Sequence, residues 1–188
     1  FKQKTAYEIR LSLVGSEMCI RDRLDAAEGQ EYSTQWYRDK IKEFGTPRRL
    51  DLLRDGRRSG SPSFGQLNMF VYGPKNKLTL PYYDTFPLVM PIGGIGGGFL
   101  GINFHYLPIP LRMRLLDKVV NFPNQLNYQG LKRISLLKPT IKKYLNGFVK
   151  SEFRIIQPDE FVVASLLPVQ NFKKAQASQV WADSRSMV

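Results

Sequence analysis

The side chains best placed to do chemistry in this sequence are its cations, which occur in groups along the chain. Many Lys and Arg residues with few acids neutralise a polyanion, and phosphate contacts need no base-reading geometry. Residues 131–150 contain no acidic residue, whereas a solvated helical face usually mixes both signs. The alternative is that the same basic face meets an acidic protein surface in an assembly. We predict that nucleic acid is bound by Arg48, Arg49, Arg54, Arg57, Arg58, Arg112, Arg114, Lys132, Arg133, Lys138, Lys142, Lys143, Lys173 and Lys174.

Catalytic chemistry has few candidate residues. His105 is the only histidine and Cys19 the only cysteine, which excludes a multi-Cys zinc site and an internal disulfide framework. No G-x-S-x-G pattern occurs, so no nucleophile elbow is indicated. A metal-dependent nuclease stays open as an alternative, because Glu152-Phe153-Arg154 approaches an acidic-x-Lys pattern with Arg in place of Lys. We predict no catalytic residue, no metal and no cofactor.

A glycine-rich stretch, residues 96–101, formally matches G-x-G-x-x-G. A dinucleotide site needs a helix directly after this pattern, because the helix N-terminus holds the phosphates. The residues that follow alternate with a period of two, which favours a strand. We therefore predict a hairpin tip, and a loop that admits the backbone of a partner is the functional alternative.

Aromatic residues gather in residues 80–87, which contain Tyr82, Tyr83 and Phe86. Aromatic side chains stack on unpaired bases, and they also fill the cores of small barrels. The sequence leaves three possibilities open for them: core packing, stacking on nucleic acid, or a protein interface.

Residues 1–23 resemble a translated sequencing adapter. The stretches 2–9 and 13–23 match the codons of two adapter oligonucleotides in one reading frame. The rival interpretation is an amphipathic N-terminal helix or a signal peptide. The apolar run, residues 11–14, is shorter than a signal peptide requires. Without this segment, the 188 residues become 165, with 23 Lys and Arg, 13 Asp and Glu and no cysteine. We expect the natural N-terminus to be missing.

The remaining length predicts one main domain. No apolar run approaches the roughly 20 residues of a membrane span, so we expect no membrane contact. We expect residues 24–66 to form N-terminal helices and a basic linker. The apolar residues of 31–44 have helical periodicity, and a short basic helix is expected at 47–55. Residues 56–66, rich in Gly, Ser, Pro and Arg, form the linker. Residues 67–188 form the main domain.

Alternation, turns and prolines in the main domain predict an α+β fold. It would be a small SH3-like β-barrel of five or six short strands, with N-terminal helices, a helical insertion at about 108–146 and a C-terminal helical extension. Pro87 and Pro91 indicate that their strand is bent or lies at an edge. The expected strands are 67–72, 78–80, 86–92, 99–107, 148–156 and 161–167; the expected helices are 111–120, 131–137, 139–145 and 173–184.

Several strings of residues resemble a known family. They are Y-x-P-K at 72–75, L-P-Y-Y-D at 80–84, P-L-V at 87–89 and G-x-N-x-H-Y-L-P at 101–108, together with residues 166–185. They are similar to DNA end protector proteins, minor head proteins of contractile-tailed bacteriophages, over most of residues 31–188. Gly73 departs from the family pattern, where Asp is expected. The motif residues that we expect to form a core or an interface are Tyr82, Tyr83, Asp84, Asn103, His105 and Tyr106.

The resemblance implies a virion protein, present in the host cytoplasm during assembly, that protects double-stranded DNA ends from host exonucleases. Its partners would be double-stranded DNA ends and the head, portal or neck proteins of the phage. The family supplies no catalytic residues. A purely structural head–neck or baseplate protein is the alternative.

Overall fold

A computed structural model describes residues 57–120 and 135–188. The described residues contain β-strands, α-helices and short 3-10 helices, in agreement with the α+β prediction. The described strands are β1 (Arg57–Ser59), β2 (Asn68–Met69), β3 (Tyr83–Asp84), β4 (Leu88–Ile95), β5 (Gly98–Asn103), β6 (Ile141–Leu145), β7 (Phe153–Ile155) and β8 (Phe172–Lys173). The α-helices are α4 (Ile109–Val120), α6 (Phe161–Leu166) and α7 (Ala177–Met187); the 3-10 turns are η1 (Phe104–Tyr106), η2 (Ser135–Leu137), η3 (Asn146–Phe148) and η4 (Pro158–Glu160). No helix among the described residues is long and apolar enough to cross a membrane.

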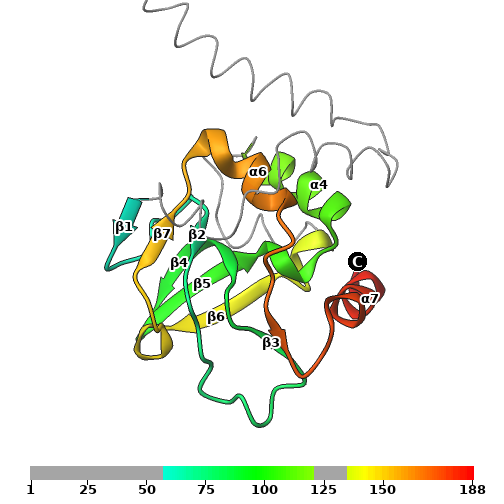
Figure 1. The fold of residues 1–188 in the computed structure, drawn as a ribbon, viewed down its shortest axis with the longest axis horizontal. Helices are drawn as coiled ribbons and strands as arrows, with labels where there is room; N and C mark the ends of the chain where they lie inside the picture. Colours follow the sequence, from blue (N-terminus) through cyan, green and yellow to red (C-terminus); the bar gives the residue numbers. More distant parts are fainter. Residues whose placement is uncertain (1–56, 121–134) are drawn as a thin grey trace, which may run out of the picture.

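Six strands form one antiparallel sheet in the order β1-β7-β2-β4-β5-β6, and β3 pairs with β8 in a second, two-stranded sheet (Figure 1). The strands β6 and β7 follow one another through η3. The chain after β2 continues the pairing with the chain before β7, because Tyr72 bridges Val149. The α+β class is therefore confirmed, and barrel closure stays a prediction.

The six-stranded sheet is strongly curved. Neighbouring strands lie about 4.8 Å apart, so strands three steps apart in a flat sheet are separated by about 14 Å. The ring centroids of Phe99 on β5 and Phe153 on β7 are nevertheless only 5.9 Å apart, and those of Phe70 and Tyr144 only 5.4 Å. The concave face thus encloses one aromatic cluster: Phe70, Tyr72, Val89, Phe99, Tyr144 and Phe153.

The opposite face of the sheet carries the larger core. Leu88, Met90 and Ile102 point from β4 and β5 into a cluster that also contains Leu115 of α4 and Leu166 of α6. The helices α4 and α6 pack on one another on this side of the sheet (Figure 1). Alternate residues of one strand therefore serve two different cores.

The hairpin β4–β5 confirms the predicted tip, with its turn at Gly96-Gly97. Pro91 lies beside an irregularity where the register shifts between Pro91 and Gly93, so the predicted bend is present. The edge position is wrong, because β4 lies between β2 and β5. Proline has no backbone N–H to donate to a neighbouring strand. The bulge interrupts the regular hydrogen bonding between the strands at this point, so Pro91 is tolerated in an interior strand.

Three predicted elements are wrong in type or extent. Residues 99–107 do not form one strand: β5 ends at Asn103, whose side chain caps η1. Residues 139–145 are not a helix, because Ile141–Leu145 pairs with β5 as strand β6. Residues 161–167 are not a strand, because η4 opens with a capping box between Gln157 and Glu160 and leads the chain directly into α6.

The remaining boundaries differ in smaller ways. Residues 78–80 form no strand, and only Asn68–Met69 of 67–72 and Phe153–Ile155 of 148–156 are assigned as strands. The predicted linker 56–66 contains β1. The C-terminal helix is confirmed as Ala177–Met187. The predicted helices at 31–44 and 47–55, the adapter-like segment 1–23, and most of the predicted helix 131–137 lie outside the described residues.

A glycine controls the contact between β5 and β6. A Cβ added at Gly98 would lie 1.9 Å from the carbonyl oxygen of Tyr144, so the backbone of β6 would have to move. We expect Gly98→Ala to lower the free energy of unfolding by about 2 kcal/mol, in the range of other overpacked sites. Chemical denaturation measures this change. Gly94→Ala, in the paired strand with nothing within 4 Å of its Cβ, is the control; equal effects of the two substitutions would contradict the prediction.

Candidate nucleic-acid interface

The described surface is strongly basic. Residues 57–120 and 135–188 contain fifteen Lys and Arg but only six Asp and Glu. Twelve of those cations are exposed, whereas among the acids whose side chains are described only Glu152 is exposed. The exposed cations are Arg57, Arg58, Lys75, Lys77, Arg114, Lys118, Lys138, Lys143, Lys150, Lys173, Lys174 and Arg185.

One group of cations lies at the β1 edge of the sheet. Arg58 on β1 is directly opposite Arg154 on β7, and Arg57 is its neighbour in the chain. Like charges opposite one another on paired strands repel. Here Glu152 offsets part of the repulsion, with its carboxylate 3.9 Å from the Arg58 guanidinium at the exposed surface.

A second group lies on β6, the last strand of the sheet at its other end. Lys143 is exposed. Lys142 is partly buried, and its Nζ lies 4.0 Å from the centroid of the Tyr106 ring, a cation–π contact. Burial lowers the pKa of Lys142 to about 8. The two neighbouring lysines therefore occupy different environments, and Lys143 is the freer of the two to meet a phosphate.

Arg112 does not belong to the surface, which corrects the prediction that it binds nucleic acid. Its side chain is fully buried. Nε donates to Leu107 O at 2.7 Å, Nη1 donates to Leu167 O at 3.2 Å, and Nη2 donates to the Gln170 side chain at 3.1 Å. Burial lowers its pKa to about 9, opposed by the negative charge of Asp84, so the group is charged at neutral pH. Arg112 joins α4 to the chain after α6.

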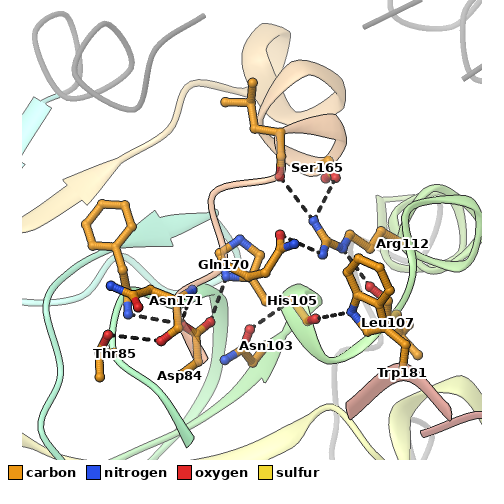
Figure 2. Close-up of polar contacts among 12 residues, drawn as sticks. Asp84, Thr85, Asn103, His105, Leu107, Arg112, Ser165, Gln170, Asn171 and Trp181 are labelled. Carbon is orange, nitrogen blue, oxygen red and sulfur yellow. Dashed lines mark hydrogen bonds and ion pairs between the residues drawn. The ribbon is translucent and has the colours of Figure 1, made fainter. Parts of the chain in front are cut away.

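The centre of the motif strings is a buried ion pair between β3 and η1 (Figure 2). Nδ1 of His105 lies 2.7 Å from Oδ2 of Asp84, and both side chains are almost completely buried. Oδ1 of Asp84 accepts from the backbone N–H groups of Phe86 and Asn171. Burial alone would raise the pKa of Asp84, but the charge and hydrogen bond of His105, with the two N–H donors, outweigh it and hold the pKa below its ordinary value.

Neighbouring motif residues fix the histidine in place. Asn103 accepts from the His105 backbone N–H and donates to the Tyr144 hydroxyl, so one side chain ends β5, caps η1 and reaches β6. Nε1 of Trp181 on α7 donates to the His105 carbonyl (Figure 2). Strings that are up to about a hundred residues apart in the sequence thus meet in one polar network.

The aromatic motif residues divide between core and surface. Phe86 and Tyr106 are buried, whereas Tyr82 and Tyr83 are half-buried. Tyr106 packs edge-on against Phe172 of β8, with ring centroids 5.3 Å apart, and Tyr82 lies 6.0 Å from Tyr106. Packing therefore accounts for most of the aromatic ring area in this motif.

A protein-family model matches residues 4–184, and its description is phage T4 terminal DNA protecting protein. The chain belongs to this family. The resemblance drawn from the motif strings is therefore confirmed. The matched range starts inside the segment 1–23, whose origin stays a prediction. No curated protein and no solved structure matches the chain.

The predicted interface residues fall partly inside and partly outside the described part of this family member. Among the predicted cations, Arg57, Arg58, Arg114, Lys138, Lys143, Lys173 and Lys174 are exposed. Arg48, Arg49, Arg54, Lys132 and Arg133 lie outside the described residues. Five further exposed cations were not among the predicted ones: Lys75, Lys77, Lys118, Lys150 and Arg185. For Lys75 and Lys77, the absence of acidic residues from 73–81 was a signal in the sequence.

The part of the chain that the structure describes contains no group of side chains that would support the nuclease alternative. Within residues 57–120 and 135–188, no three His, Cys, Asp or Glu side chains lie together in a way that would hold a metal ion. Glu152, the acid of the candidate nuclease pattern, points to the surface beside Arg58.

Proposed function

We propose that this chain is a virion protein that binds the ends of packaged double-stranded DNA in a contractile-tailed phage and shields them from host exonucleases. Membership of the terminal DNA protecting family supports this proposal directly. The role needs occupancy of the DNA end and no chemical step, so the chain needs no catalytic residue. Location in the virion, with passage through the host cytoplasm during assembly, follows from the same role.

The observation that carries the proposal is the charge of the described surface. Twelve exposed cations face solvent against one exposed acid among the acids whose side chains are described. A surface of this kind attracts any polyanion at low salt and releases condensed counterions when it binds DNA. The cations lie on many different elements rather than on one recognition helix, which fits binding to phosphates without base readout.

The salt dependence of binding tests this mode. We expect affinity for blunt duplex DNA to fall steeply with salt, with a log–log slope of about −0.9 for each phosphate contacted. Replacing Lys138 and Lys143 together by Gln should make the slope shallower by about 2 and weaken the binding of unrelated sequences equally. Fluorescence anisotropy at several salt concentrations measures both effects.

Glu152→Gln is the control of opposite sign, because it removes an exposed negative charge and should leave affinity equal or higher. In parallel, the wild-type chain should delay digestion of linear DNA by a processive exonuclease. Absence of binding at low salt, or binding that ignores salt, would contradict the proposal and favour the head–neck structural role, in which the basic face meets acidic protein.

We also propose that the sheet closes as the SH3-like barrel expected from the sequence. The order β7-β2-β4-β5-β6 supports this topology, since β6 and β7 are consecutive in the chain and are separated by the 3-10 turn η3. The aromatic contacts between strands three steps apart support it as well, because they require strong curvature.

A further inference from the structure

The loop between β2 and β3 carries the most exposed large apolar side chain among the described residues. Leu78 is 87% exposed, and Lys75 and Lys77 beside it are also exposed. The loop, residues 73–81, contains no acidic residue. In Figure 1 it projects from the bottom of the view, away from the sheet and the helices. The loop therefore presents an apolar side chain to solvent directly after two exposed cations.

This loop is held in a defined conformation by the chain around it. The backbone N–H groups of Thr79 and Leu80 both donate to Asn76 O, which forms a turn beneath the tip. Nζ of Lys174 reaches across from the end of β8 and donates to Leu78 O at 2.7 Å and Leu80 O at 2.9 Å. These contacts fix the backbone on both sides of the exposed leucine.

Lys174, which holds the loop, has an unusual backbone conformation. Lys174 has a φ of +69°, the one positive value among the described non-glycine residues. A left-handed conformation is unfavourable for a lysine, so it persists where surrounding contacts impose it. The two hydrogen bonds to the loop are the contacts that the Lys174 side chain makes from this conformation.

A DNA end differs from the interior of a duplex in one large physical feature. Phosphates repeat along the whole duplex, so cations by themselves attract the interior and the end alike. Only the end exposes the flat, apolar face of a base pair. Proteins insert Leu and similar side chains against unstacked base faces elsewhere in DNA recognition. An exposed apolar side chain with cations close beside it can therefore give a protein a preference for ends.

We propose that the 73–81 loop is the element that recognises the end, with Leu78 packed on the terminal base pair and Lys75 and Lys77 on the phosphates of the last nucleotides. This inference rests on the proposed function, because it assigns the preference for ends to a place on the DNA-binding surface. The ligand is an open duplex terminus, and Lys174 is a positioning residue for the loop.

Two DNA probes separate recognition of ends from general DNA binding. One is a blunt linear duplex; the other is the same duplex closed at both ends by hairpin loops, which has no terminal base-pair face. The wild-type chain should bind the open duplex at least tenfold more tightly than the closed one. Leu78→Ala should lose about tenfold in affinity for the open duplex and nothing for the closed one. Leu78→Trp should keep the preference, because an indole also stacks on a base pair.

Matched variants distinguish the loop from the rest of the surface. Phe64→Ala, at another exposed apolar side chain, should change neither affinity. Lys174→Met should reduce the preference for the open duplex more than Lys173→Met, since both remove one charge from the same strand end but only Lys174 holds the loop. Equal effects of these two substitutions would contradict the positioning role of Lys174.

The failure of this inference differs from the failure of the proposed function. If the wild-type chain binds open and closed duplexes equally, or if Leu78→Ala weakens both equally, the loop does not recognise ends although the chain binds DNA. If the wild-type chain binds neither duplex at low salt, the proposed function and the inference fall together.

Discussion

Replacing Arg112 by Met should lower the free energy of unfolding by about 4 kcal/mol, which makes it one of the two most damaging substitutions that we predict. Met retains much of the apolar volume of the side chain but donates no hydrogen bond. The carbonyls of Leu107 and Leu167 and the side chain of Gln170 would each lose a donor inside the protein. A buried acceptor without a donor costs about 1–3 kcal/mol. The contact of the guanidinium with the Trp181 ring, 5.6 Å away, would be lost as well.

Arg114→Met is the matched control for this experiment. Arg114 lies two residues further along α4 and is exposed, so its replacement removes the same charge from the same helix without opening a buried network. We expect a change within about 0.5 kcal/mol for this control. Urea or guanidinium denaturation of both variants measures the difference. Similar stabilities of the two variants would show that Arg112 does not join α4 to the chain after α6.

Asp84→Asn should lower the free energy of unfolding by about 3 kcal/mol at neutral pH. The amide keeps an oxygen for the N–H groups of Phe86 and Asn171 but places its own N–H groups toward Nδ1 of His105. The ion pair is lost, and an amide N–H group then faces Nδ1 of His105, which is the donor in the wild-type pair. Glu152→Gln, at an exposed acid, is the control and should cost less than about 1 kcal/mol.

The pH dependence of stability should identify the same carboxylate. The pKa of Asp84 in the folded protein lies below its ordinary value of 3.8, so folding favours its charged form. The stability that this provides is fully present above the unfolded pKa, and it is lost as the pH falls through 3.8 toward the folded value. Between pH 5 and pH 2 the wild-type chain should therefore lose more stability than Asp84→Asn. Equal losses would contradict a depressed pKa at Asp84.

The secondary structure was predictable where local signals were unambiguous. The β4–β5 hairpin was visible from its glycine-rich tip, α4 from its helical spacing, and the C-terminal helix from its composition. The prediction failed for Phe161–Leu166, because a short apolar run has no period that separates a buried strand from a buried helix. It also failed for Ile141–Leu145, where pairing with β5 and the place of Tyr144 in the aromatic cluster favour a strand.

The excess of positive charge was predictable from the sequence, but which of the cations are exposed was not. A count of cations cannot distinguish Arg112 from Arg114, which are neighbours in one helix: one is completely buried and the other exposed. It also cannot show that Lys142 packs on Tyr106 while Lys143 faces solvent. Exposure depends on which elements pack together, and for Arg112 that includes the carbonyls of residues more than fifty positions away.

The sequence by itself determined the basic character of this protein, its scarcity of catalytic residue types, its α+β class and its family, because composition and short motifs carry these properties directly. Only the tertiary structure decided that Asp84, His105, Asn171 and Trp181 form one polar network around a buried ion pair, and that Lys174 holds the loop that presents Leu78. Both arrangements depend on contacts between segments distant in the chain. Such contacts arise from the packing of whole elements, so no local pattern of residues encodes them.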